Sequence, residues 1–272
     1  MSSASPGRRT PQVSVVVVTH DHAEDLDACL DSLGAAMARV EAELILIDNR
    51  SDDASFEIAH ASAPQPSSLV RNQARKGFSA NVNEGIRRSG AELILTLNPD
   101  TVIDPAAIAE LLAQMRSHPQ AGVLAPALYY PDGRLQPSRR RFPTFRSTIA
   151  RRTPLRRWLR ESSSNRDHLM MDEDQAPAIP QPIDWALGAC LMLRRTALDE
   201  VGLFDERYPL YVEDIDLCYR MHQRGWEVVY VPSARVEHRH LAVTDRRWLT
   251  PRTFAHFRGM LRFVRKHGVS YR

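Results

Sequence analysis

Three apolar runs in the first half of the sequence are each followed at once by polar side chains. If these runs are parallel strands, their carboxyl ends share one edge of the sheet, where ligands bind. A single acid at a strand end is equally well explained as a turn former or a helix N-cap. Three such ends together favour a ligand-binding edge. The runs and their polar residues are Val13–Thr19 with His20 and Asp21, Glu43–Asp48 with Asp48 and Asn49, and Glu92–Leu97 with Asn98 and Asp100.

These carboxylates suit a hard divalent cation that neutralises a diphosphate. Asp100 closely follows its apolar run and is the leading candidate ligand. A carboxylate, a histidine and phosphate oxygens together suit Mg²⁺ or Mn²⁺. Asp48 is better placed to hydrogen-bond a base or a ribose, as acids after strands do in nucleotide sites. The residues therefore predict a nucleotide site with a divalent metal.

A second acidic cluster, Glu213-Asp214-x-Asp216, opens a predicted helix. Acids in a first turn stabilise a helix by complementing its dipole, which is a purely structural explanation. The functional interpretation is a general base, for which one carboxylate must reach an acceptor hydroxyl within about 3 Å. The residues alone leave both interpretations open.

Composition and motif content exclude several classes of protein. The 272 residues, 43% hydrophobic and 25% charged, have globular averages and exclude a disordered or fibrous chain. The cysteines Cys29, Cys190 and Cys218 lack metal-ligand spacing and are expected to be reduced. No G-x-G-x-x-G follows the first strand and no Walker lysine loop occurs, which argues against a dinucleotide fold and a P-loop.

Strands alternate with helices in the first half, which predicts βαβ units and a mostly parallel sheet. The second half is predicted to hold further strands, the acidic helix and a last helix beyond Pro251. The predicted strands are Val13–Thr19, Glu43–Asp48, Leu69–Arg71, Glu92–Leu97, Gly122–Leu128, Trp185–Leu193, Val228–Val231 and Arg235–Glu237. The predicted helices of the first half are Asp25–Ala38, Ser55–Ala61, Ser79–Arg88 and Ala106–Ser117.

Six motifs, in order and spacing, resemble the inverting family-2 glycosyltransferases of the GT-A fold. They are VVVVTHDH, LILIDNRSDD, RNQARKGFSANVNEGI, LTLNPD, GACLMLRR and GLFDERYPLYVEDIDLCYR. The resemblance implies an α/β chain with a GT-A (Rossmann-like), mostly parallel sheet flanked by helices, and a C-terminal acceptor-side region and helix. It implies transfer of a sugar from a nucleoside diphosphate to a hydroxyl, with inversion at the anomeric carbon.

The resemblance also implies a division of the chain into a GT-A domain between two flanking segments. The domain comprises a nucleotide-sugar-binding half, a basic and Pro-rich insertion, and an acceptor and catalytic half. The expected segments are a disordered start (1–11), the GT-A domain (12–240, with its parts at 12–130, 139–182 and 183–240) and a C-terminal amphipathic helix (241–272).

Roles carry over residue by residue from the resemblance. Asp214 matches the catalytic base and Glu213 the acid beside it. Asp100 stands for the last acid of the Asp-x-Asp metal motif, and His238 falls where related galactofuranosyltransferases supply a metal-binding histidine. The implied cofactor is Mg²⁺ or Mn²⁺. The residues implied for the nucleotide and donor sugar are Thr19, Asp21, Asp48, Asn49, Ser51, Asn72, Gly77, Phe78, Asn81 and Asn98, and those on the acceptor side are Trp185 and Gly188.

Two departures from the family pattern bear on which donor is used. The usual Tyr-Asn after the first-strand threonine is His20-Asp21 here, and Arg75 stands where an asparagine is usual. The metal motif reads Asn-Pro-Asp, a variant common in the rhamnosyltransferase-like branch. The resemblance therefore favours dTDP-L-rhamnose as donor and a lipid-linked or cell-envelope glycan as acceptor, with a UDP-sugar donor as the alternative.

Two other classes of function are alternatives to this one. A nucleotidyltransferase also binds nucleotides with a metal, but it carries a Gly-rich, basic loop after the first strand, and THDHAED is no such loop. A nucleic-acid-binding module is suggested by nine arginines between Arg139 and Arg160. Only three aromatic residues interrupt that segment to stack bases, so we expect no nucleic-acid partner.

Charge and hydrophobicity also predict where the chain resides. The sequence starts without an apolar signal region and has no apolar run near 18 residues, so we expect a cytoplasmic chain. The segment Arg139–Arg160 has no acid within a chain of net charge +3, which suits an anionic membrane surface. We therefore expect peripheral association with the inner face of the cell membrane, driven mainly by that segment. A stripe on the last helix, Phe254, Phe257, Leu261 and Val264 with basic residues around it, either enters the lipid interface or closes the core.

Overall fold

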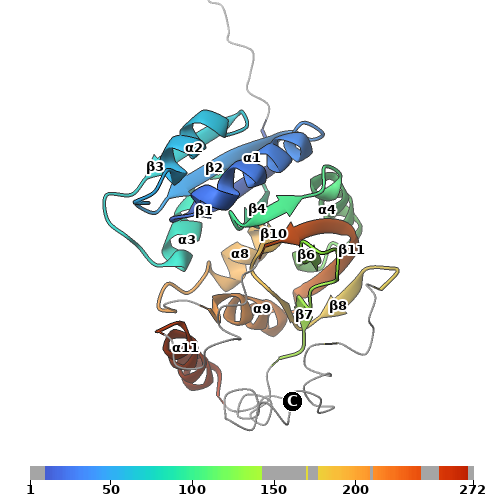
Figure 1. Ribbon diagram of the computed structural model, residues 1–272. Coiled ribbons are helices and arrows are strands. Elements are labelled where there is room, and N and C mark those ends of the chain that lie inside the picture. The colour runs from blue at the N-terminus through green and yellow to red at the C-terminus, as the bar shows by residue number, and fades with distance from the viewer. Residues whose placement is uncertain (1–9, 143–169, 171–176, 209–210, 240–250, 269–272) are drawn as a thin grey trace, which may run out of the picture.

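The computed structural model describes residues 10–142, 170, 177–208, 211–239 and 251–268, which form a sheet covered by helices on both faces (Figure 1). The strands are β1 (Val13–Thr19), β2 (Ala42–Asp48), β3 (Ser67–Arg71), β4 (Leu93–Leu97), β5 (Thr101–Ile103), β6 (Ala121–Tyr129), β7 (Arg139–Arg140), β8 (Gln181–Ile183), β9 (Trp185–Ala186), β10 (Cys190–Arg194) and β11 (Glu227–His238). The helices are α1 (Ala23–Met37), α2 (Ser55–Ser62), α3 (Phe78–Arg88), α4 (Ala107–Ser117), α8 (Arg195–Val201), α9 (Glu213–Gln223) and α11 (Pro251–His267).

The first half of the sheet is parallel, as the sequence predicts. The strand order is β3-β2-β1-β4-β10-β6-β11-β5, with β8 paired to β11. Strands β1 to β4 all run in one direction. Every residue of β1 is buried, because helices cover the sheet on both sides, and this explains its unbroken β-branched run.

The second half of the sheet is mixed, and two predictions there need correction. The predicted strand Trp185–Leu193 is two strands, because the chain turns at Leu187–Ala189. Before that turn β9 pairs with β7 in a separate ribbon, and after it β10 runs antiparallel between β4 and β6. The strands predicted at Val228–Val231 and Arg235–Glu237 are one strand, β11, whose register shifts between them. Pro232 lies at that shift, where a strand tolerates a residue without an N–H.

Alternate residues of the strands supply two hydrophobic cores, one on each face of the sheet. Odd-numbered valines of β1 pack beneath α1, α2 and α4. Even-numbered valines of the same strand pack against α3, α8, α9 and α11. The period of two residues along a strand therefore assigns each side chain to one core. The three cysteines are buried and unpaired, as expected.

Gly85 lies in the middle of α3, where that helix approaches β1 closely. A methyl group at Gly85 would collide with Cγ1 of Val16, which is itself buried. We expect Gly85→Ala to lower the free energy of unfolding by about 1–3 kcal/mol through overpacking, although alanine favours a helix over glycine by about 1 kcal/mol. Urea denaturation measures this change.

The matched control for that variant is Gly90→Ala. At Gly90 the nearest atom to an added methyl group is Glu43 Oε1, at an ordinary 3.7 Å. This control should change the unfolding free energy by no more than about 0.5 kcal/mol. A Gly85→Ala protein as stable as the wild type would contradict the close packing of α3 on β1.

The last helix, α11, packs on α9 by a face other than the stripe that the sequence assigned to either the lipid interface or the core. Met260 and Phe263 are buried against the core, whereas Phe254, Phe257 and Leu261 are 61%, 59% and 42% exposed. The core interpretation of the stripe is therefore wrong for these three residues. None of the described helices is both long and apolar enough to span a bilayer.

Candidate functional site

Thr19 and Asp48 meet at the carboxyl ends of β1 and β2, where they are register partners. Both side chains are fully buried. The Asp48 carboxylate accepts hydrogen bonds from the backbone N–H of Ser51 at 3.3 Å and lies 3.4 Å from Nε of Arg71. Thr19 Oγ1 has no hydrogen-bond partner among the described residues. A buried hydroxyl without a partner is rare in folded proteins, and a bound ligand is one way to satisfy it.

Asparagine side chains shape the loop that leads into α3. Nδ2 of Asn72 donates to Oδ1 of Asn49 at 3.0 Å and to Oδ1 of Asn81 at 2.6 Å. Oδ1 of Asn49 also accepts from the backbone N–H of Lys76 at 2.8 Å. Gly77 precedes the helix, and an added Cβ there would meet nothing within 4 Å. The predicted asparagines thus hold the loop, which leaves open space beside Gly77. Phe78, the first residue of α3, packs partly buried on the core.

The two departures from the family pattern lie side by side. Nη2 of Arg75 is 3.5 Å from Oδ2 of Asp21 and 2.7 Å from Oδ2 of Asp52. Oδ1 of Asp21 accepts the backbone N–H of Asp52 at 2.8 Å. Asp21 has a φ of 55°, a left-handed conformation that aspartate tolerates better than most residues. His20 adds a further contact, with Nε2 at 3.5 Å from Asp21.

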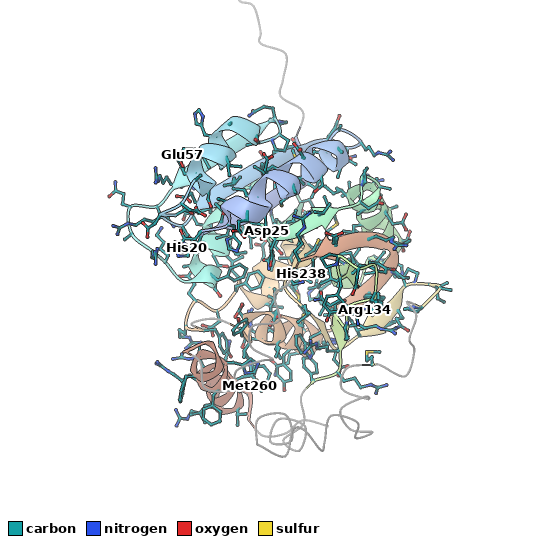
Figure 2. The ribbon with its side chains drawn as sticks, viewed as in Figure 1. His20, Asp25, Glu57, Arg134, His238 and Met260 are labelled. Atoms are coloured by element: carbon teal, nitrogen blue, oxygen red, sulfur yellow. The ribbon has the colours of Figure 1, made fainter. Side chains whose placement is uncertain are left out.

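Asp100 and His238, the two predicted metal ligands, come from opposite halves of the chain and lie close together. His238 ends β11 and lies near the centre of the molecule in Figure 2. Its Nε2 is 3.5 Å from Oδ2 of Asp100. Its Nδ1 is 2.9 Å from Oε1 of Gln136, and because a glutamine Oε1 only accepts, Nδ1 is the donor. Nε2 is therefore the ring atom that faces the carboxylate.

The chemistry of this pair fits a divalent cation. Burial by itself would raise the pKa of Asp100, but the hydrogen bond and charge of His238 hold the pKa below its ordinary value. Oδ1 of Asp100 is buried without a hydrogen-bond partner in the described structure. The described residues contain no cluster of three or more His, Cys, Asp or Glu side chains that could hold a metal. Asp100 and His238 would thus be the protein ligands, with phosphate and water oxygens completing the shell, as is usual for Mg²⁺.

The acids at the start of α9 differ in the groups that contact them. Asp216 is fully buried and structural, because Tyr208, Arg220, Lys266 and His267 all contact its carboxylate at 2.8–2.9 Å. Two of these partners come from α11, so Asp216 fastens that helix to α9. Asp216 therefore has a structural role through these contacts, in addition to its place with the other two acids in the first turn of α9.

Asp214 is held by the backbone rather than by side chains. Its Oδ2 accepts the N–H of Gly188 at 3.2 Å, and its Oδ1 accepts the N–H of Ile215 at 2.8 Å. A methyl group at Gly188 would lie 3.5 Å from Cβ of Asp214, so this segment approaches the acid closely. Burial raises the pKa of Asp214 against the opposing effect of these N–H donors and of Arg140. A carboxyl with a raised pKa is a stronger base once ionised.

One turn of the chain links Asp214 to the strand end that carries Asp100. Gly188 donates to Asp214, while the carbonyl of Ala189 accepts the N–H of Asn98 at 2.8 Å. The Asn98–Asp100 segment and the start of α9 therefore lie on either side of Leu187–Ala189. Trp185, predicted on the acceptor side, is 4% exposed and donates from Nε1 to the carbonyl of Arg141.

The backbone before Glu213 is strained. Tyr211 and Val212 have φ values of 65° and 77°, and left-handed backbone is unfavourable for a bulky residue and most of all for a β-branched one. Such strain persists only where surrounding packing imposes it, and it concentrates at functional sites. Here α11 supplies the packing, because a methyl group at Gly259 would lie 3.0 Å from Cγ2 of Val212.

The buried carboxyl of Glu213 should make the free energy of unfolding depend on pH. Burial, with the Asp214 charge adding to it, raises the pKa of Glu213 to about 8. The folded chain then keeps a proton that the unfolded chain loses above its ordinary pKa of about 4.3. The contribution of Glu213 to the free energy of unfolding is therefore fully present below a pH of about 4.3 and is lost as the pH rises towards 8. We therefore expect Glu213→Gln to stabilise the protein at pH 8 by as much as about 5 kcal/mol, but not at pH 4.

Urea denaturation between those two pH values measures the difference. Glu227→Gln, at an exposed position on β11, is the matched control and should show no such pH dependence. Equal effects of Glu213→Gln at both pH values would show that the Glu213 carboxyl is not held protonated.

Three residues that contact the site were not predicted from the sequence. Gln136 orients His238, Arg71 neutralises Asp48, and Arg140 lowers the pKa of Asp214. Arg140 also lies over the ring of Trp185, 5.2 Å from its centroid. Arg140 therefore belongs to the part of the basic segment Arg139–Arg160 that contacts the site. No local pattern marks these residues, because each acts across a long separation in sequence. Residues 143–160 of that segment lie outside the described residues.

Comparison with known proteins identifies the family of this chain. Residues 14–202 match the family described as glycosyl transferase family 2. A relative from Mycobacterium tuberculosis, named N-acetylglucosaminyl-diphospho-decaprenol L-rhamnosyltransferase, is 32% identical over 253 residues, which cover 87% of this chain and 79% of that protein. An N-acetylglucosaminyltransferase from Azorhizobium caulinodans is 28% identical over 83% of this chain and 54% of its own length.

Solved structures share the fold at low sequence identity. GalNAc-T7 with UDP, GalNAc and Mn²⁺ has a TM-score of 0.61 and 18% identity, covering 84% of this chain and 43% of that structure. The mannosyltransferase PcManGT from Pyrobaculum calidifontis, with GDP-Man and Mn²⁺, has a TM-score of 0.57 and 15% identity, covering 84% and 56%. The chain thus spans about half the length of these structures, which show the fold alone. The family match over most of the chain shows that this protein belongs to glycosyl transferase family 2, with the GT-A fold.

Proposed function

We propose that this enzyme transfers a sugar from a nucleoside diphosphate to an acceptor hydroxyl with inversion, and that Asp214 is the general base. The observation that carries the proposal is the placement of Asp214, which is half-buried, held by two backbone N–H groups and linked through one turn to the Asn98–Asp100 strand end. Each carboxylate oxygen keeps a second lone pair for the acceptor proton. The hydroxyl oxygen forms the new bond as the diphosphate leaves from the opposite face of the sugar.

The donor occupies the edge formed by the ends of β1, β2 and β4 in this proposal. Asp48 and the unpartnered Thr19 hydroxyl bind the nucleoside, with Asn49 and Ser51 holding the turn beside them. Asp21 lies at the same strand end. Asn72, Asn81, Gly77 and Phe78 form the wall beside the sugar, and Asn98 orients the strand end that carries Asp100.

A divalent metal, Mg²⁺ or Mn²⁺, is the proposed cofactor. Asp100 and His238 would hold it, for the reasons of charge and orientation given above. When bound, such an ion stabilises the negative charge of a departing diphosphate. The chain's own contribution is to orient the two ligands, through Gln136 at the histidine and through the backbone contact between Arg239 N–H and the Asp100 carbonyl.

We propose L-rhamnose from dTDP-rhamnose as the donor sugar and a lipid-linked diphosphate glycan as the acceptor. The M. tuberculosis relative supports this proposal, because its name states rhamnosyl transfer to N-acetylglucosaminyl-diphospho-decaprenol and it matches most of this chain. A lipid-linked acceptor places the reaction at a membrane surface. Gly188, whose N–H holds Asp214, and Trp185, which supports Arg140, are the proposed acceptor-side residues.

Release of nucleoside diphosphate tests the proposal directly. The full chain is incubated with Mn²⁺, a short-chain prenyl diphosphate N-acetylglucosamine and each of dTDP-rhamnose, UDP-, GDP- and other dTDP-sugars. We expect acceptor-dependent release from dTDP-rhamnose alone, with the product of inverted configuration. Release from a UDP-sugar instead would keep the enzyme class and overturn the donor. Absence of release from every donor would overturn the proposal as a whole.

A further inference from the structure

The outer face of α11 carries an apolar stripe beside a row of arginines. Phe254, Phe257 and Leu261 are three of the four large hydrophobic side chains exposed in the described structure. At 100° per residue they fall within one narrow sector of the helix, and the exposed Arg258, Arg262 and Arg265 fall in the sector next to it. The sequence of α11 contains no acid.

In the described part of the chain this face is exposed, and the opposite face already holds the helix in place. Met260 and Phe263 are buried in the core, and Lys266 and His267 are bound to Asp216. The exposed stripe therefore stabilises neither α11 nor the fold. Exposing such side chains together costs solubility, and grouped exposed hydrophobics mark interaction sites.

From this arrangement we infer that α11 docks the enzyme on an anionic lipid surface, with Phe254, Phe257 and Leu261 in the interface and the arginine row at the headgroups. An apolar stripe with adjacent arginines and no acid is the pattern of helices that lie in the plane of a bilayer. A second copy of the chain is a poorer occupant, because α11 would bring arginines to face arginines and no acid to pair them.

Docking here would place the catalytic pair close to the membrane. The inner face of α11 contacts the segment before Glu213, where a methyl group at Gly259 would lie 3.0 Å from Val212 and 3.3 Å from the Tyr211 carbonyl. A helix is about 10–12 Å across with its side chains. One helix thickness therefore separates the lipid surface from the residues beside Asp214. This step rests on the proposed function, because a lipid-linked diphosphate acceptor presents its diphosphate at headgroup level.

Vesicle sedimentation of the full chain tests the inference. We expect wild type to pellet with vesicles of phosphatidylglycerol and phosphatidylcholine at low salt, and less so at high salt or with phosphatidylcholine alone. A triple serine variant, which combines Phe254→Ser, Phe257→Ser and Leu261→Ser, should bind the vesicles at least about tenfold more weakly. A triple glutamine variant, which combines Arg258→Gln, Arg262→Gln and Arg265→Gln, should lose the preference for anionic vesicles. Ile179→Ser removes an equally exposed hydrophobic residue elsewhere and should bind like wild type.

Three outcomes would overturn the inference. The first is the absence of vesicle binding by wild type, and the second is undiminished vesicle binding by the triple serine variant. The third is a wild-type protein that forms a dimer in solution while the triple serine variant is a monomer. Undiminished binding would assign the membrane contact to other parts of the chain, such as the arginines after residue 142. Release of nucleoside diphosphate in vesicle-free solution with a short-chain acceptor should be equal for wild type and the serine variant. That measurement separates failure of docking from failure of the proposed function.

Discussion

Asp214→Asn is expected to abolish sugar transfer while leaving donor binding unchanged. An amide cannot take up the acceptor proton, and loss of a general base costs about 10²–10⁴ in rate. The amide oxygen can still accept the N–H of Gly188 at the position where Oδ2 now lies. Donor contacts at Asp48 and Asp100 belong to other strand ends and are untouched. Turnover and the dissociation constant of the nucleoside diphosphate, measured side by side, give the two results.

Asp199→Asn is the matched control for this variant, since it makes the same chemical change on the exposed face of α8. It should retain wild-type turnover. If Asp214→Asn kept more than about a tenth of wild-type turnover, against the expected loss of at least 10², another group would have to be the base. A parallel loss of donor affinity would instead indicate a structural role for the carboxylate.

Removal of the proposed metal, or of its proposed ligand Asp100, is expected to have the second largest effect. We expect a chelator to stop turnover and Mg²⁺ or Mn²⁺ to restore it. Loss of an outer-shell partner already costs about 10–100-fold in metal affinity, so Asp100→Ala should weaken Mn²⁺ and donor binding by at least that much. A readout that needs no turnover is the thermal shift produced by Mn²⁺ with a nucleoside diphosphate, which wild type should show and Asp100→Ala should lack.

Asp31→Ala, on the exposed face of α1, controls for the loss of an acid without loss of a ligand. Its thermal shift should match that of wild type. Full turnover in EDTA would show that no metal is needed and would leave Asp100 as a structural partner of His238. An unchanged shift in Asp100→Ala would move the metal to other ligands.

Local pattern was enough to predict the parallel strands β1 to β4 and the helices that follow them. The run at Val13–Thr19 is buried on both faces, and such runs occur only where a parallel sheet is covered on both sides. The helix periods and turn residues between the runs are local signals as well. Because parallel strands share a carboxyl edge, the order of the elements was also enough to bring Thr19 and Asp48 together. The sequence by itself therefore determined the parallel half of the sheet and the residues at its strand ends.

Only the tertiary structure decided how the second half completes the site. The antiparallel insertion of β10 breaks the predicted strand Trp185–Leu193 and places Gly188 beside Asp214, 26 residues away. Gln136 reaches His238 across 102 residues and Arg75 reaches Asp21 across 54. The face by which α11 packs was decided in the same way, through Met260 and Phe263 rather than the predicted stripe. These contacts depend on the packing of whole elements against one another, and a local period of two or 3.6 residues carries no information about such distant partners.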